Sequence, residues 1–504
     1  MIPVWVASAA AMGIAAAATR GSLDVMTGLA AYALGAAALG AMSMGHEYSN
    51  HTLGSLLSQP VGRGRIFLIK LVVLAAMLLT LYAMAVAFFD VNVVFAAFRQ
   101  NANAPWLRIV IASLPALCGL LLAPWLTMLC RSTLAGFVFA LAVPAGISMA
   151  GTLVGLLRFG HTDEALPLIY GFSFGVLWRG TLLLSAIAAF MSWRTFMRLQ
   201  AVDGDVDRIP QLRTKAAAIS TRRQRPLWLL LKKEVRLQQT TFVFAGLYLA
   251  YWLVVAGVRV WVPTFLDPSL FAITMIYGGT LALLIGSLGS AEERQAGTLE
   301  WQMLLPMAAW RQWALKVGIL LSLALLLTVG LPVLLAYVHP LADLNVITRG
   351  TPSIPTAVAL VTMAVFISLY VSTLSNSTVK SLLISIAVVA MGSRVLPMSV
   401  LAFAHNALSV AIMREWTSDQ ARDFLSRLRY LHSIESVLTL SLLAIVVGLV
   451  AWFALLNHRS AERGTRRTVV QASWIVGALM IGSAVVGLIA VAIAGAVRFP
   501  SQLK

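Results

Sequence analysis

Residues 71–89 read LVVLAAMLLTLYAMAVAFF, an uninterrupted apolar run without a charged side chain. A helix needs about 20 apolar residues to cross the roughly 30 Å hydrocarbon layer of a bilayer. Backbone polar groups inside lipid must be satisfied within the segment itself, which favours an α-helix for such a run. This stretch, with Lys70 at its inner end, therefore predicts a membrane-spanning helix at 70–89.

The composition extends this interpretation to the whole chain. Of 504 residues, 60% are hydrophobic and only 11% are charged, and the mean hydropathy is +0.88. Soluble globular proteins carry roughly 25% charged residues. A chain this apolar and this long would aggregate in water unless lipid covered most of its surface. We therefore exclude a single large soluble domain and expect an all-α polytopic membrane protein.

Apolar runs of spanning length recur along the sequence. The predicted spans lie at 2–19, 25–44, 70–89, 108–129, 133–156, 177–194, 241–260, 270–290, 317–337, 355–374, 381–402, 434–456 and 471–496. The N-terminal residues lack a basic segment and a cleavage site, so the first run is predicted to be a retained span and not a signal peptide.

Charge between the spans predicts the orientation. Basic residues concentrate in alternate loops, beginning with the loop after the second span, and this bias marks cytoplasmic loops. The N-terminus is therefore predicted to be cytoplasmic, and thirteen spans place the C-terminus on the other side. Arg20 and the segment at 414–429 run against the bias; the stretch at 413–430 resembles an amphipathic helix on the outer surface.

Several function classes find no support in the sequence. The net charge of +18 is divided among short loops, without the continuous basic stripe that nucleic-acid binding requires. Cys118 and Cys130 form neither a disulfide framework nor a metal cluster by their spacing. We therefore expect no metal site, no nucleic-acid partner and no cofactor held by this chain.

An internal repeat links the two parts of the chain. At an offset of 246 residues, Glu47 aligns with Glu293, Thr52-Leu53 with Thr298-Leu299, and Pro60 with Pro306. Arg65 and Lys70 align with Arg311 and Lys316 at the same offset. A second match at an offset of 245 aligns the loop 129–133 with 374–378. These matches predict a tandem duplication of a six-span unit. An even number of spans separates equivalent loops, so the two units should be parallel, with a cavity between them.

The repeated loop combines acidic residues, a Thr-Leu pair, a proline and basic residues before the next span. A glutamate and a threonine near a helix start can cap free N–H groups, and the proline would end a short amphipathic helix. The basic residues are expected at the headgroup level. Such a helix between two spans is suited to transmit a push from the cytoplasm. The candidate residues of the two loops are Glu47, Thr52, Leu53 and Pro60, and Glu293, Gly297, Thr298, Leu299, Glu300 and Pro306.

These loops resemble the inner loops of ABC-2 type transporter permeases, the transmembrane subunits of type V fold ABC exporters. The second copy, Glu-x3-Gly-Thr-Leu-Glu from Glu293 to Glu300, is the closer match. The resemblance implies that each loop is a coupling helix that docks on an ATP-binding subunit, and that six-helix units work in pairs. It further implies a multi-pass protein of a bacterial-type cytoplasmic membrane.

The first copy departs from the family pattern. His51 stands where the second copy has Gly297, and Gly54 stands where it has Glu300, so the two coupling surfaces are expected to be unequal. The first half also lacks a counterpart of an amphipathic interface helix at 226–239. The predicted organisation is a first permease repeat at 1–194, a basic linker at 195–225, a second repeat with the interface helix at 226–469, and an extra spanning helix at 470–504.

The chain is not expected to be an enzyme, because it lacks the Gly-x4-Gly-Lys-Ser/Thr loop that cradles nucleotide phosphates. ATP and magnesium would bind to a separate ATPase, of which two copies are expected as partners beside membrane lipid; an accessory subunit is a further candidate. The predicted function is the permease subunit of an ATP-driven exporter. Its interior, rich in Met, Phe and Trp, favours a hydrophobic or amphipathic substrate, exported through the cavity between the halves.

Two alternatives stay open. A twelve-helix secondary transporter would also have parallel halves, but it needs coupling carboxylates in its spans, whereas Asp and Glu lie almost wholly in loops here. A membrane-embedded lipid-modifying enzyme would need paired carboxylates or a histidine cluster at the interface. Arg179 and Arg394 are the basic residues that could face a cavity or interface, although anchoring at the outer headgroups is the favoured interpretation for both.

Overall fold

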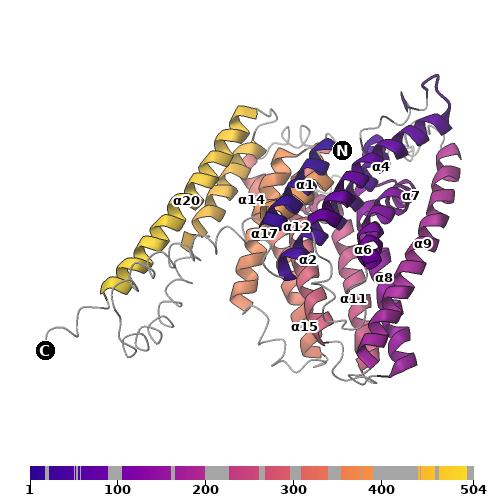
Figure 1. Cartoon of the computed structure of the whole chain (residues 1–504). Helices are drawn as coiled ribbons and strands as arrows, with labels where there is room; N and C mark the ends of the chain where they lie inside the picture. The colour runs from indigo at the N-terminus through magenta and orange to yellow at the C-terminus, as the bar shows by residue number, and fades with distance from the viewer. Residues whose placement is uncertain are drawn as a thin grey trace, which may run out of the picture.

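A computed structural model of the chain is a bundle of long helices in the residues that it describes (Figure 1). The structure describes residues 1–17, 22–49, 52, 55–56, 58–88, 105–160, 165–198, 226–259, 267–295, 308–338, 354–375, 377–389, 441–442, 444–459 and 465–496. Within these ranges the chain contains helices, turns and no strand. The all-α prediction is confirmed for this part of the chain.

The first half of the chain supplies six spans. They are α1 (Ile2–Ala17), α2 (Ser22–Ser49), α4 (Arg63–Phe88), the continuous α6 (Pro105–Leu117), η1 (Cys118–Leu122) and α7 (Ala123–Cys130), then α8 (Thr133–Phe159) and α9 (Leu166–Arg198). The η1 segment is π-helical. Some helices are longer than the predicted spans. For example, α2 extends beyond the predicted span 25–44 at both ends, because helix formation continues through polar residues that flank an apolar run.

The second half begins with a short amphipathic helix, which is followed by further long helices. Its elements are α10 (Pro226–Leu237), α11 (Gln239–Arg259), α12 (Asp267–Gln295), the continuous α14 (Ala309–Leu325), η3 (Leu326–Gly330) and α15 (Leu331–Val338), then α17 (Ile354–Leu374), the helices Thr378–Val389 and Ala444–His458, and α20 (Thr465–Ala496). The helix α10 occupies the place predicted for the interface helix.

Nine helices within the described residues are long and apolar enough to cross a membrane. Shorter apolar helices at Ile2–Gly13, Thr378–Val389, Ala444–His458 and Arg467–Gly482 coincide with the four remaining predicted spans. Many large apolar side chains on these helices face outward, such as Leu183, which is 64% exposed, and Met480, which is 70% exposed. In water such a surface would be unfavourable, whereas lipid covers it without cost.

A close helix crossing occurs in each half. A Cβ atom added to Gly40 of α2 would collide with the backbone carbonyl of Gly119, and one added to Gly286 of α12 would lie 2.6 Å from the carbonyl oxygen of Val365. Small residues let helix backbones approach closely, and in lipid this packing drives helix association. Gly40 and Gly286 lie 246 residues apart in the sequence, and so do their partners Gly119 and Val365.

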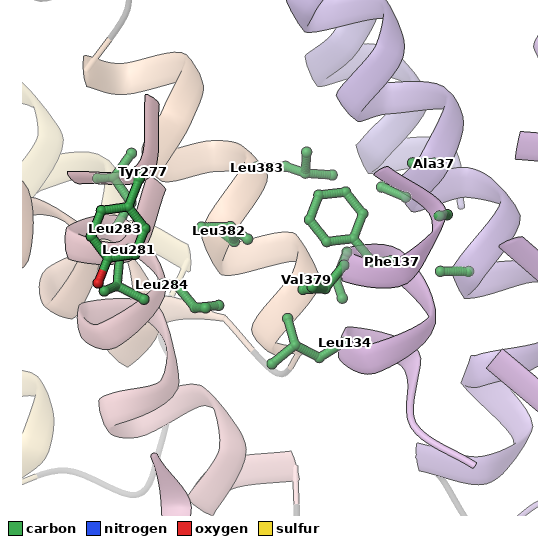
Figure 2. Close-up of a cluster of buried hydrophobic side chains, with 14 of the residues drawn as sticks. Ala37, Leu134, Phe137, Tyr277, Leu281, Leu283, Leu284, Val379, Leu382 and Leu383 are labelled. Carbon is green, nitrogen blue, oxygen red and sulfur yellow. The ribbon is translucent and has the colours of Figure 1, made fainter. Parts of the chain in front are cut away.

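The two halves meet through apolar side chains of α8 and the helix Thr378–Val389. Figure 2 shows Leu134 and Phe137 of α8 facing Val379, Leu382 and Leu383. All five are buried members of one apolar cluster that extends into α2 and α12. The core of the bundle is therefore shared between the halves, and α8 and the helix Thr378–Val389 form its centre.

The last helix packs on the second half alone within the described residues (Figure 1). A separate apolar cluster joins Tyr370 and Val371 of α17 to Val446 and Val450 of the helix Ala444–His458, with Leu479 of α20 against it. In addition, a Cβ atom on Gly482 of α20 would collide with the side chain of Leu442. The helix α20 is thus held by close packing against other helices of the second half.

Candidate functional site

The residues of the repeated loops are only partly described. Glu47 and Glu293 lie in the last turns of α2 and α12, and Thr52 and Pro60 follow α2 as exposed residues. The remaining loop residues predicted from the sequence lie outside the described residues: Leu53, Gly297, Thr298, Leu299, Glu300 and Pro306. The structure therefore shows where each loop leaves its helix and where the glutamates lie.

In the first half, Glu47 forms an ion pair with Lys70. The Nζ atom of Lys70 donates to the Glu47 carboxylate and to the carbonyl oxygen of Ser43, at 3.2 Å. The side chains of Lys70 and Glu47 are 18% and 15% exposed. This pair joins the inner end of α2 to the first turns of α4 across the loop.

The second half contains the same contact at equivalent positions. The Nζ atom of Lys316 donates to the Glu293 carboxylate and to the carbonyl oxygen of Gly289, at 2.8 Å. Here the side chains of Lys316 and Glu293 are only 2% and 0% exposed. The sequence predicts Lys70 and Lys316 at the headgroup level, and the structure adds that both pair with the loop glutamates. Each lysine lies 23 residues after its glutamate.

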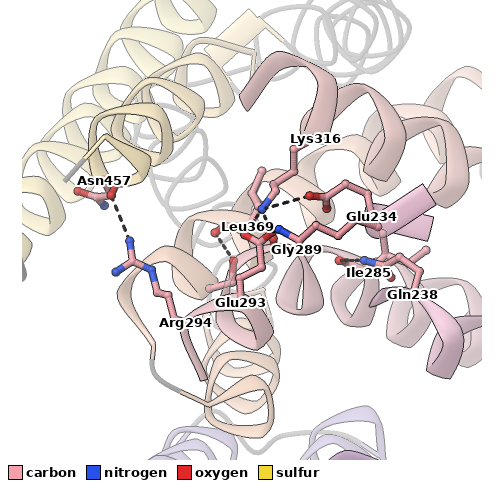
Figure 3. A network of polar contacts seen from close by, with 11 residues as sticks. Glu234, Gln238, Ile285, Gly289, Glu293, Arg294, Lys316, Leu369 and Asn457 are labelled. Carbon is pink, nitrogen blue, oxygen red and sulfur yellow. Dashed lines mark hydrogen bonds and ion pairs between the residues drawn. The ribbon is translucent and has the colours of Figure 1, made fainter. Parts of the chain in front are cut away.

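The helix α10 closes over the second pair (Figure 3). The Nζ atom of Lys233 donates to Oε1 of Glu293 at 2.6 Å, and Oε1 of Glu234 lies 3.6 Å from Nζ of Lys316. Gln238 adds a hydrogen bond to the carbonyl oxygen of Ile285 at 3.4 Å. Among the described residues, the first pair is more exposed, and its contacts come from α2 and α4.

Burial changes the chemistry of this charge cluster. Lys316 is buried between two carboxylates, and removal of either partner would leave a charge uncompensated in a medium of low dielectric constant. Burial raises the pKa of Glu234 to about 7, against the opposing attraction of Lys316. The cluster thus ties three elements, α10, α12 and α14, together through charges that water does not screen.

A second polar network, missed by the sequence analysis, attaches α20 beside this cluster. Asn457 and Gln471 exchange two amide hydrogen bonds of 3.0 Å, and Tyr370 donates to Oε1 of Gln471 at 3.3 Å. Arg294 donates to the carbonyl oxygen of Asn457 at 3.1 Å. The sequence signal that could have indicated this network is the presence of two amide side chains, Asn457 and Gln471, beside apolar runs. Since Arg294 directly follows Glu293, α20 is linked to the exit of the second loop.

The second sequence match also corresponds to similar local geometry. Gly136 donates its N–H to the carbonyl oxygen of Ser132 at 3.0 Å, and Ser381 donates to that of Ser377 at 3.0 Å. Each serine precedes the first turn of its helix, and Oγ of Ser132 accepts from the N–H of Ala135 as an N-cap. The two short loops therefore turn into α8 and the helix Thr378–Val389 in the same way.

Of the two basic residues that were candidates to face a cavity or interface, the structure describes one. Arg179 lies inside α9 with an exposed side chain, which agrees with a position on the outside of the bundle. Arg394 lies outside the described residues. Among the described side chains, no group of three His, Cys, Asp or Glu residues is arranged to hold a metal ion.

The geometry defines the class of this protein. It is a multi-pass membrane protein, helical throughout the residues that the structure describes, with a buried charge cluster at the ends of α12 and α14 that flank the second loop. Comparison with protein-family models, curated proteins and solved structures finds no match.

Proposed function

We propose that this chain is the permease subunit of an ATP-driven exporter of the ABC-2 type. It would contain two parallel six-helix repeats in one polypeptide, followed by an additional C-terminal span. The loops after α2 and α12 would be the coupling helices that dock on ATP-binding subunits. The exported molecule would be hydrophobic or amphipathic and would pass between the halves.

The observation that carries the proposal is the duplicated ion pair. Glu47 with Lys70 and Glu293 with Lys316 join the two helices that flank each loop, and each lysine also binds the carbonyl oxygen four residues before its glutamate. The matching helix crossings at Gly40 and Gly286 support the same duplication. Two unrelated halves would not be expected to share contacts at one sequence offset.

The ion pairs suggest how a push on a loop would reach the spans. A loop whose two flanking helices are joined by a charge pair moves as one body with them, because separating the charges inside the membrane is costly. ATP binding would bring two ATPase subunits together and displace both loops. The apolar contact between α8 and the helix Thr378–Val389 would then separate or close as the halves rock.

The remaining parts of the proposal follow from this mechanism. The chain would contribute no catalytic site, and ATP with magnesium would bind to the partner ATPase. Two copies of that ATPase would bind one permease chain, with an accessory subunit as a further candidate partner. The complex would lie in a bacterial-type cytoplasmic membrane, with the N-terminus and both coupling loops on the cytoplasmic side.

The test is reconstitution with an ATP-binding subunit. The affinity-tagged chain would be purified from native membranes, its stoichiometric partner identified, and the ATPase activity of the reconstituted complex measured in liposomes. We expect a Walker-type ATPase to co-purify and its activity to depend on the permease. A matched variant with the exposed residue Thr52 changed to Arg should weaken the association. An isolated chain that transports by itself on an ion gradient would contradict the proposal.

A further inference from the structure

A polar cavity lies where the inner ends of the two halves meet. Its volume is about 260 Å³, and both halves line it. Tyr48, Arg131 and Thr133 come from the first half, and Glu292, Gln295 and Thr378 come from the second. We name this space the inner vestibule. It lies between the exits of the two repeated loops, since Tyr48 follows Glu47 and Glu292 precedes Glu293.

The vestibule ends at the apolar contact between the halves. Leu134 and Val379 line it, and the same two side chains belong to the buried cluster that includes Phe137 and Leu382 (Figure 2). A molecule in the vestibule would therefore meet polar groups on one side and apolar side chains on the other. This arrangement suits an amphipathic molecule that places its polar end toward the inner surface.

Two polar atoms of the vestibule have unmet hydrogen-bonding capacity. Within the part of the chain that the structure describes, Oε2 of Glu292 and the hydroxyl of Tyr48 are buried and have no hydrogen-bond partner. Buried polar groups are rarely left in this state, and each exception calls for an explanation. A carboxylate oxygen accepts and never donates when ionised. A positively charged donor at this position would satisfy Oε2 of Glu292 and would also favour the ionised form of its carboxyl group.

Charge at the vestibule favours a cation at the Glu292 position. Arg131 is the basic residue that lines the cavity within the described chain, but its side chain is exposed, and it forms no described ion pair with Glu292. Water and salt screen an exposed charge strongly and a buried one weakly. Oε2 of Glu292 is therefore less screened than the Arg131 side chain, which favours a cation over an anionic head group beside it.

We infer that the inner vestibule binds the protonated amine of an amphipathic substrate. The ammonium group donates to Glu292 and to the hydroxyl of Tyr48, and the apolar part lies against Leu134 and Val379. The direction of transport in this account rests on the proposed function, whereas the binding of the amine does not. The inference narrows the proposed substrate class from amphipathic molecules in general to amphipathic amines.

The test is equilibrium binding of three matched eight-carbon probes to the purified chain without any ATPase. Radiolabelled octylamine, octanol and octanoate would be titrated against the chain in nanodiscs of neutral lipid, with empty nanodiscs subtracted. We expect octylamine to bind about tenfold or more tightly than octanol, since hydrogen bonds to charged groups contribute about that factor, and octanoate to bind most weakly.

Three variants assign the preference to the site. Glu292→Gln keeps the shape and removes the charge, and it should lower the affinity for octylamine about tenfold while leaving octanol binding unchanged. Glu292→Asp keeps the charge and should retain the preference for the amine. Tyr48→Phe should lower octylamine affinity by a smaller factor. Unchanged octanol binding and an unchanged elution profile show that each variant is folded.

Two outcomes would overturn the inference. One is a wild-type chain that binds octylamine and octanol equally. The other is a folded Glu292→Gln chain that keeps the full preference for octylamine. Because the measurement uses the chain alone, the amine site can be confirmed even if no ATPase associates, and it can fail while the exporter complex forms.

Discussion

Lys316 and Glu293 form an almost fully buried ion pair, and its two partners are separated by the same 23 residues as the more exposed pair of Lys70 and Glu47. The covalent spacing and the carbonyl contact are alike in both halves, but the surroundings differ because α10 covers only the second pair. The same ion pair therefore lies in a more polar medium in the first half and in a less polar medium in the second. The second pair is expected to respond much more strongly to the loss of one charge.

The first prediction compares the two lysines. Lys316→Met should lower the free energy of unfolding by about 3–5 kcal/mol, because it removes the buried cation between Glu234 and Glu293 and leaves Glu293 only the partly exposed Lys233. Lys70→Met should cost about 1 kcal/mol, since water reaches Glu47. Unfolding titrations with SDS in mixed micelles measure both. Lys232→Met, at an exposed position of α10, is the control and should have little effect. Equal losses for Lys70 and Lys316 would refute the assigned difference in burial.

The second prediction concerns pH. Burial raises the pKa of Glu234 from its ordinary value of 4.5 to about 7, so the folded chain holds a proton that the unfolded chain has lost between these values. The contribution of this group to stability is present below pH 4.5 and is lost as the pH rises through 7. Unfolding titrations from pH 5 to 8 should show a decline of about 1–3 kcal/mol in the wild type and a flatter profile in Glu234→Gln. Parallel pH profiles for the wild type and Glu234→Gln would contradict this prediction.

The third prediction tests the two helix crossings. Gly40→Ala and Gly286→Ala each place a methyl group against a backbone carbonyl of the neighbouring helix. Both substitutions should therefore destabilise the protein, by about 1–3 kcal/mol. Gly279→Ala is a matched control in the same helix as Gly286, because a Cβ atom there meets nothing within 4 Å. Since alanine favours a helix more than glycine does, a control as damaging as the Gly286 variant would show that the close crossing does not decide the result.

The fourth prediction concerns the attachment of α20. Asn457→Leu or Gln471→Leu alone leaves a buried amide without its partner and should cost about 1–3 kcal/mol. The double variant should cost clearly less than the sum of the single variants, since it removes both polar groups. Ser473→Ala, at an exposed position of α20, serves as the control. Strictly additive losses would mean that the amide pair does not hold α20 in place.

The sequence predicted the helices well because the signal is local. A run such as residues 71–89 has one stable conformation in lipid, and the predicted interface helix at 226–239 corresponds to α10 and the start of α11. Boundaries were predicted less well. The sixth span was predicted at 177–194, whereas α9 begins at Leu166, because tyrosine and serine residues before position 177 lower the local hydropathy without ending the helix.

The candidate site was predicted in position but not in its contacts. The offset of 246 residues singled out Glu47, Glu293, Lys70 and Lys316, yet spacing alone does not show that the lysines turn back to the glutamates. That contact depends on how α12 and α14 pack, and Gly289 lets them approach, because an added Cβ atom there would lie 2.6 Å from Leu320. The Asn457–Gln471 pair likewise depends on tertiary packing, and no local pattern in the sequence predicts it.

The measurement that tests the account most directly is native mass spectrometry of the complex released from detergent. A single permease chain that carries two coupling loops on one face should bind two ATPase subunits, one at the loop after α2 and one at the loop after α12. The expected spectrum contains one 504-residue chain with two copies of the ATPase. A stable assembly of two permease chains with two ATPases would contradict the account, because the two halves of one chain would then not form a complete transmembrane unit.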